Sequence, residues 1–394
     1  MTTTPFICKI TVREISFALI ITKSEGSYAK IMSRNEKNAK KSTALKDCIA
    51  YQMSLHRHTE PCDIVKLCYQ AAFGAEHLLS DIKRAREYFE KEFLDTPPTN
   101  GEIAEGISSD VCRVNIGAWK KNNLPAEWLF SLFLLSSEGI CKTEDKNALF
   151  YDYIASAREL MVEKDELFPF STEQFDAFFE GYPSPPVAIH HSSRYREKEE
   201  PSYRIVSKAL CRLIPILIRA KDFIGSEKCI IAIDGRAASG KTTMASALSR
   251  ILSASVLYAD DFFLPPSLRT PERFRAPGSN IHLERLAEEV VPYLRGDKPF
   301  SYRIFDCSIM DYNGRRSIEP SKFIIVEGSY SHHPLLRDYA DIKVFSDVDK
   351  SEQLTRIISR NGKEMAEMFK KRWIPLEEEY FSAFSIKERS DLCL

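Results

Sequence analysis

The residues Gly235-Arg-Ala-Ala-Ser-Gly-Lys-Thr-Thr243 decide the fold class of this 394-residue chain. They fit G-x-x-x-x-G-K-[ST], the Walker A pattern of a phosphate-binding loop (P-loop). An apolar run, Cys229–Ile233, precedes the loop and predicts a buried strand, and helical spacing over Thr243–Leu252 follows it. A glycine-rich turn between a strand and a helix directs backbone N–H groups and the positive helix end towards phosphate oxygens. The stretch therefore predicts a nucleotide-binding loop in an α/β domain.

Each position of this loop has an expected role in holding ATP and Mg²⁺. Lys241 is long enough to reach the β- and γ-phosphates, and the hydroxyl of Thr242 is a ligand for Mg²⁺. The other positions supply backbone amides. The residues predicted to bind the nucleotide are Gly235, Ala238, Ser239, Gly240, Lys241, Thr242 and Thr243.

Acidic residues follow two further strand-like runs. Asp260 and Asp261 come directly after the run Val256–Ala259, and Glu327 comes directly after the run Phe323–Val326. Ligands of doubly wound sheets bind at the carboxyl ends of strands. We therefore expect Asp260 to accept the proton of an attacking hydroxyl, and Glu327 and Asp261 to contact Mg²⁺. The structural alternatives are a helix cap or turn for the Asp pair and a surface position for Glu327.

Cations near the C-terminus add positive charge. Arg356-Ile-Ile-Ser-Arg360 is followed by Phe369-Lys-Lys-Arg-Trp373. Such residues can close over a nucleotide and neutralise the transferred phosphoryl group, although a solvated helix face has the same composition. Arg360 is the strongest candidate, and with Lys241 and Asp260 it completes the predicted catalytic set.

Changes in composition and hydrophobic pattern along the chain indicate two main parts. Residues 46–182 carry amphipathic helical patterns, and residues 183–204, rich in proline, histidine and charge, are typical of a linker. From 205 to 394, short apolar runs alternate with helical segments, which predicts a doubly wound parallel sheet in an α/β domain. The basic segment 1–45 is predicted to be a loosely held extension, with a targeting segment as the alternative.

Composition narrows the functional class. The chain has 55 Lys and Arg and 56 Asp and Glu, a net charge of -1, which disfavours general nucleic-acid binding. Ten scattered cysteines without a C-x-x-C pair are typical of reduced thiols in a cytoplasmic protein. The sequence has no window of about 18 apolar residues, so it predicts no membrane-spanning helix. We expect a cytoplasmic protein with a small-molecule partner and no membrane partner; its oligomeric state stays open.

Residues 225–394 resemble the uridine kinase/phosphoribulokinase-type family of P-loop kinases. The segments that carry the resemblance occur in the family order: Asp234–Thr243, Ala259–Phe263, Tyr302–Asp306, Ile325–Gly328 and Arg372–Tyr380. The resemblance implies ATP- and Mg²⁺-dependent transfer of the γ-phosphoryl group to a hydroxyl of a small molecule. It also implies that Asp260 is the base.

The chain departs from the nucleoside kinases of that family where they bind the acceptor. Their Asp-rich ribose-binding segment corresponds to Ala276–Glu284, which contains no Asp, and their pyrimidine-reading His has no counterpart in Phe305–Met310. Arg303, Asp306 and His282 are the candidates to line an acceptor pocket here.

The first functional hypothesis is therefore a uridine-kinase-like phosphotransferase with a nucleoside-like or other hydroxyl acceptor. The second is a nucleotide-dependent regulator whose helical part binds a protein or RNA. A third is a separate enzyme active site in the N-terminal half.

Overall fold

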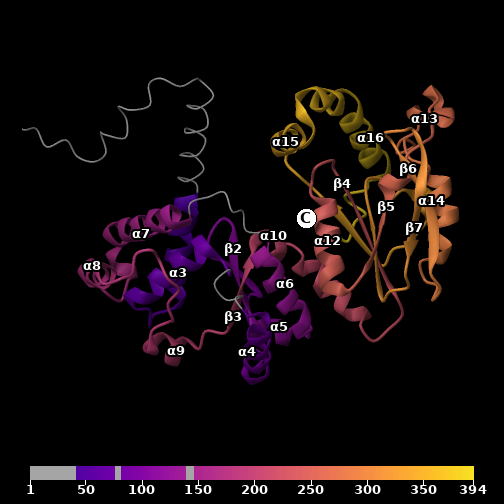
Figure 1. The fold of residues 1–394 in the computed structure, drawn as a ribbon. Coiled ribbons are helices and arrows are strands. Elements are labelled where there is room, and N and C mark those ends of the chain that lie inside the picture. The colour runs from indigo at the N-terminus through magenta and orange to yellow at the C-terminus, as the bar shows by residue number, and fades with distance from the viewer. Residues whose placement is uncertain (1–40, 76–80, 139–145) are drawn as a thin grey trace, which may run out of the picture. The chain divides into compact units, whose positions relative to one another are not determined.

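The computed structural model describes residues 41–75, 81–138 and 146–394 (Figure 1). The described residues belong to two compact units that interleave in sequence. Of the described residues, the first unit contains 41–72, 107–109 and 146–200, and the second contains 73–75, 81–106, 110–138 and 201–394. Within the described ranges, no helix combines the length and the hydropathy needed to cross a membrane.

The first unit is helical. Residues 41–55 form a helix, and a capping box at Ser171 begins another. The buried carboxylate of Asp63 lies 2.7 Å from Nδ1 of His191 and accepts hydrogen bonds from the amide and hydroxyl of Ser192, so it joins two distant segments. The named elements are α3 (Pro61–Phe73), α7 (Lys146–Glu163), a 3₁₀ turn (Asp165–Leu167), α8 (Thr172–Glu180) and α9 (Ser193–Glu199).

The second unit contains a three-stranded antiparallel sheet in the order β1-β2-β3. Its third strand, β3 (Tyr203–Ser207), pairs with β2 (Val111–Asn115) across about ninety residues of chain. The predicted boundary at residue 205 therefore falls inside a strand, and the predicted linker 183–204 includes α9. The remaining elements of this part are β1 (Ala104–Gly106), α4 (Ile82–Asp95), α5 (Ile116–Lys121), α6 (Ala126–Glu138), α10 (Lys208–Cys211), α11 (Ile214–Ala220) and a 3₁₀ turn (Lys221–Phe223).

A five-stranded parallel sheet forms the core of the second unit, in the order β10-β9-β4-β8-β5. This confirms the predicted α/β class with a parallel sheet. The strands are β4 (Cys229–Gly235), β5 (Ser255–Tyr258), β8 (Phe323–Glu327), β9 (Ile342–Ser346) and β10 (Leu392–Cys393).

Both faces of this sheet are covered. All residues of β4 are buried, and its side chains alternate between the two faces. Ile230 and Ala232 pack in a cluster with Leu286 of α14 (Leu283–Glu289) and Tyr380 of α16 (Ile374–Phe384). Helix α12 (Lys241–Leu252) packs on β4, β5 and β8. Figure 1 shows this helix beside the strands.

The segments between β5 and α16 complete the unit. Helix α14 ends at Glu289, and a 3₁₀ turn follows. Helix α15 contains a break at Gly362, whose φ is +80°. The elements are four 3₁₀ turns (Ala259–Phe262, Pro266–Leu268, Val291–Tyr293 and Pro334–Leu336), α13 (Pro271–Arg275), the antiparallel hairpin β6 (Phe300–Asp306) and β7 (Asp311–Ile318), α15 (Lys350–Met368) and a π-helical turn (Phe369–Trp373).

Candidate active site

The predicted phosphate-binding loop lies between β4 and α12, at the carboxyl end of a central strand. Gly235, which ends β4, has φ +134°, and a Cβ atom there would lie 2.1 Å from the carbonyl oxygen of Ser346. Ala238 and Gly240 also have positive φ values, of 57° and 100°. These left-handed turns carry the chain round to the first turn of α12, where its amide groups lack helical partners. The loop thus has the backbone form that anion binding requires.

The two polar side chains at the start of α12 are anchored. Nζ of the buried Lys241 donates to the carbonyl oxygens of Gly235 and Arg236 at 2.8 and 2.9 Å. The Thr242 hydroxyl donates to Oε1 of Glu327 at 3.0 Å. The chain therefore brings an ammonium group, a hydroxyl and a buried carboxylate together at the carboxyl ends of β4 and β8.

These groups open into one cavity of about 690 Å³. It receives contributions from the loop, from the turn after β5, from the end of β8 and from α15 and α16. Its lining residues are Ala237, Ala238, Gly240, Lys241, Thr242, Thr243, Asp260, Phe263, Arg269, Asn280, Ile281, Cys307, Met310, Glu327, Ser329, Tyr330, Arg356, Arg360, Met365, Phe369, Trp373 and Glu377. All three predicted catalytic residues, Lys241, Asp260 and Arg360, are among them.

The two adjacent aspartates have separate environments. Asp260 lines the cavity. The Asp261 carboxylate accepts a hydrogen bond from Arg316 Nε at 2.7 Å and one from the Tyr302 hydroxyl at 3.0 Å. It is not a cavity residue, because the 3₁₀ turn that follows β5 points consecutive side chains in different directions. The Asp261 carboxylate thus has a structural role in holding Arg316 and Tyr302, and its role as a magnesium ligand stays a prediction.

The surroundings of Asp260 change its acidity. Its side chain is exposed to the cavity, yet the enclosing protein still restricts access to water. This desolvation raises the pKa of Asp260, Asp261 adds to the rise, and Lys241 and Arg360 oppose it. Burial, and next the negative charge of Asp260, likewise raise the pKa of Glu327. The cavity thus holds two coupled carboxylates that bind protons more readily than exposed ones do.

The predicted acceptor residues do not line this cavity. His282 caps α14, where Nδ1 accepts from the Arg285 amide. Arg303 lies over the ring of Tyr312, 4.3 Å from its centre. Asp306 accepts hydrogen bonds within the β6–β7 turn, from the Ser308 amide and hydroxyl and from the Asn313 side chain. All three side chains have local partners in the hairpin or at the helix start, and their role in acceptor binding stays a prediction.

Other residues occupy the wall next to Asp260. Phe263 forms an isolated antiparallel bridge with Ile281, and this contact closes the irregular segment between them. Arg269, Asn280 and Cys307 line the cavity from that segment and from the β6–β7 turn. The sequence analysis did not identify these residues, because an irregular loop shows no periodic pattern of apolar residues. The only available signal was their position between two acidic motifs.

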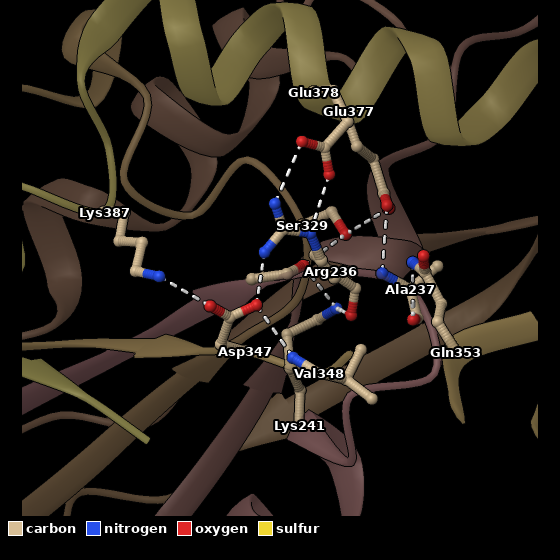
Figure 2. Close-up of polar contacts among 11 residues, drawn as sticks. Arg236, Ala237, Lys241, Ser329, Asp347, Val348, Gln353, Glu377, Glu378 and Lys387 are labelled. Carbon is tan, nitrogen blue, oxygen red and sulfur yellow. Dashed lines mark hydrogen bonds and ion pairs between the residues drawn. The ribbon is translucent and has the colours of Figure 1, made fainter. Parts of the chain in front are cut away.

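Two C-terminal helices attach to the phosphate loop, as Figure 2 shows. Arg236 donates two hydrogen bonds to the Glu378 carboxylate, at 2.7 and 2.9 Å, and also pairs with Asp347. The Ala237 amide donates to Oε2 of Glu377 at 2.9 Å, and Gln353 donates to the Ala237 carbonyl at 3.1 Å. We call this set of contacts the loop clasp. It couples the conformation of the loop to α15 and α16.

Replacing Arg236 with Gln should weaken the loop clasp. We expect the free energy of unfolding to fall by about 1–3 kcal/mol, since charge-assisted hydrogen bonds are lost from a largely buried guanidinium. The KM for ATP should rise several-fold, with a smaller change in kcat, because the loop amides lose part of their support. Urea denaturation and steady-state kinetics measure both quantities.

The matched control is Arg158→Gln. Arg158 also makes a two-point contact with a carboxylate, that of Asp176, but both side chains are exposed on the first unit. The expected loss of stability is much smaller than for Arg236→Gln, because solvent screens an exposed ion pair, and the KM for ATP should not change. Equal losses in the two variants would contradict a special role for the loop clasp.

A buried aspartate organises the same end of the sheet. Asp234, fully buried in β4, accepts hydrogen bonds from the amides of Tyr330 and His332 at 3.1 and 3.0 Å. It also accepts one from the Tyr380 hydroxyl of α16 at 2.8 Å. The segment after β8 and helix α16 are therefore held to the strand that carries the loop.

Comparisons with known proteins point to kinases. The chain is 29% identical over 148 residues to a uridine kinase of Chlamydia pneumoniae, a match that covers 35% of this chain and 66% of that protein, just under two thirds of its length. It is 27% identical to a uridine kinase of Staphylococcus epidermidis, covering 71% of it. A solved structure of a possible uridine kinase from Bacillus stearothermophilus aligns at 20% identity and a TM-score of 0.37, over 48% of this chain and 99% of that one. No family model matches the chain.

Proposed function

We propose, from the premise that this chain contains a uridine-kinase-like P-loop domain, that it transfers the γ-phosphoryl group of ATP to a hydroxyl group of a small, nucleoside-like molecule. One observation carries the proposal: Asp260 lines the same cavity as the phosphate loop and Lys241. The proposal places this activity in residues 205–394 and the protein in the cytoplasm. Residues 46–182 and the segments 1–45 and 183–204 have no part in the chemistry as proposed.

The loop is assigned to the nucleotide phosphates. The buried Ser239 hydroxyl has no hydrogen-bond partner among the described residues, and it belongs to the loop itself. Thr242 and Glu327 supply the oxygen ligands that suit Mg²⁺, and they already lie 3.0 Å apart. Bound Mg²⁺ would neutralise charge on the β- and γ-phosphates. These features support the assignment of ATP and Mg²⁺ to this end of the cavity.

The side chains have distinct proposed roles. Asp260 orients the acceptor hydroxyl and accepts its proton as the new O–P bond forms. Lys241 and Arg360 offset the negative charge of the phosphoryl group during transfer. Met365, Phe369 and Trp373 add apolar surface to the cavity lining, which favours the exclusion of water that would otherwise compete as acceptor.

An acceptor screen tests this function. The full chain is incubated with ATP, Mg²⁺ and ribonucleosides, deoxynucleosides, sugars or vitamin alcohols, and phosphorylated product is detected by mass spectrometry. We expect product with one acceptor class, and at least about 100-fold less from an Asp260→Asn preparation, since a contaminating kinase would give equal amounts in both preparations. ATP turnover that only a protein or RNA stimulates would favour the regulatory alternative.

The acid limb of the pH profile tests the role of Asp260. A base must be deprotonated, and the pKa of Asp260 is raised, so kcat/KM should begin to fall, as pH decreases, at a higher pH than an ordinary aspartate with a pKa of about 3.9 would allow. Arg360→Gln removes a charge that opposes the rise, so its acid limb should move to still higher pH. A limb that stays in place in this variant would remove Arg360 from the surroundings of the base.

A further inference from the structure

The cavity wall beside Asp260 combines an apolar surface with one cation. Phe263, Ile281 and Met310 contribute the apolar part, and Arg269 is the only arginine or lysine that lines the cavity from the segment between β5 and α14 in the described ranges. The other cationic residues of the cavity, Lys241 among them, come from the phosphate loop and from α15. The bridge between Phe263 and Ile281 fixes the two ends of the segment that presents Arg269.

Arg269 differs from its arginine neighbours in its partners. Its Nε donates to the carbonyl oxygen of Leu264 at 2.8 Å, and its guanidinium lies 5.9 Å from the centre of the Phe305 ring. Among residues 41–75, 81–138 and 146–394, no carboxylate lies within ion-pair distance of it. By contrast, three other arginines of this unit pair with carboxylates: Arg273 with Glu284, Arg285 with Glu289, and Arg316 with Asp261.

The Cys307 thiol relates Arg269 to the proposed base. Burial raises the pKa of this thiol, the Arg269 guanidinium opposes the rise, and the Asp260 carboxylate adds to it. Arg269 and Asp260 therefore both affect the pKa of Cys307, which lines the same cavity. Asp260 and Arg269 both line the cavity, so a ligand that fills it would meet both side chains.

We propose that the acceptor carries an anionic oxygen group, a carboxylate or a phosphate, that binds Arg269 while its hydroxyl faces Asp260. This inference rests on the proposed kinase function and narrows its acceptor class. A planar guanidinium binds either anion through two parallel hydrogen bonds, and the half-buried, largely apolar wall strengthens that attraction. In the described ranges, the segment between β5 and α14 adds no carboxylate to the cavity lining other than Asp260, so little in this segment would repel an anionic acceptor.

Matched acceptor pairs test the inference. The full chain with ATP and Mg²⁺ is given glycerate or glycerol, pantothenate or its alcohol analogue, and ribose 5-phosphate or ribose. We expect the anionic member of a pair to have at least a tenfold higher kcat/KM. The first two pairs report a carboxylate and the third a phosphate, so the preferred pair identifies the anion. A preference for the neutral members would overturn the inference.

Variants of Arg269 provide a second test of the inference. In Arg269→Gln, the KM for the anionic acceptor should rise about 30- to 100-fold, with a much smaller change in kcat and in the KM for ATP. Arg269→Lys should restore part of the affinity, which a general packing defect would not allow. Arg315→Gln is the control, because Arg315 lies exposed on β7, outside the cavity, and it should leave the acceptor KM unchanged.

The failure of this inference is distinguishable from failure of the kinase function. If neutral nucleosides are phosphorylated with a KM that Arg269→Gln does not alter, the kinase function stands and the role of Arg269 is overturned. If no member of any pair and no nucleoside yields a phosphorylated product, the proposed function falls and the inference falls with it.

Discussion

Replacing Asp260 with Asn should lower kcat by about 10²- to 10⁴-fold, the usual contribution of a positioned base. The amide keeps the shape of the side chain but cannot accept the acceptor's proton. Binding of ATP should persist, because the phosphate loop and Lys241 are unchanged. Single-turnover kinetics with the acceptor found in the screen, together with a direct measurement of ATP affinity, separates the loss of chemistry from a loss of binding.

Asp261→Asn is the matched control, because it makes the same chemical change one residue along the chain. Its carboxylate is bound by Arg316 and Tyr302. We expect a loss of about 1–3 kcal/mol in the free energy of unfolding, since the contact of a buried carboxylate with Arg316 is weakened. The Mg²⁺ concentration for half-maximal rate should stay unchanged. A large increase in that concentration would instead restore Asp261 as a ligand of the metal.

Replacing Gly235 with Ala should destabilise the whole second unit. The positive φ of 134° costs a non-glycine residue about 1–2 kcal/mol, and the new Cβ would lie 2.1 Å from the Ser346 carbonyl oxygen. Relief of that overlap costs about 1–3 kcal/mol more, because β4 and β9 would have to separate. We expect the free energy of unfolding to fall by about 2–5 kcal/mol and ATP binding to weaken, as measured by urea denaturation and nucleotide titration.

Gly314→Ala isolates the backbone contribution. Gly314 also has a positive φ, of 82°, but a Cβ there would meet no atom within 4 Å. Its expected cost is therefore the backbone part alone, about 1–2 kcal/mol, with no effect on ATP binding. Similar losses at the two glycines would show that the approach of Ser346 carries no energetic weight.

Much of the second unit was predictable because its signals are local. The phosphate loop requires glycines at left-handed positions, and a parallel strand buried on both faces must be a short apolar run. These requirements act over a few residues, so the runs around Cys229–Ile233 and Phe323–Val326 predicted strands that the structure contains. The same logic placed Asp260 and Glu327 at strand ends, and both line the cavity.

Long-range pairing was not predictable in this way. Strand β3 pairs with β2, far away in the chain, so composition alone suggested a linker up to residue 204, where the strand has already begun. The acceptor candidates depend on long-range information of the same kind. Arg303 and Asp306 carry suitable chemistry, but a hairpin that closes on itself turns their side chains to local partners.

The amino-acid sequence by itself determined the nucleotide-binding loop, the parallel sheet behind it and the acidic strand ends, because backbone conformation and burial on two faces restrict residue types at short range. Only the tertiary structure decided which of two adjacent aspartates faces the cavity, that Glu377 and Glu378 hold the loop, and that Arg269 lines the same cavity as Asp260. Those outcomes depend on the direction of single side chains. That direction is set by contacts with segments that are distant in the chain.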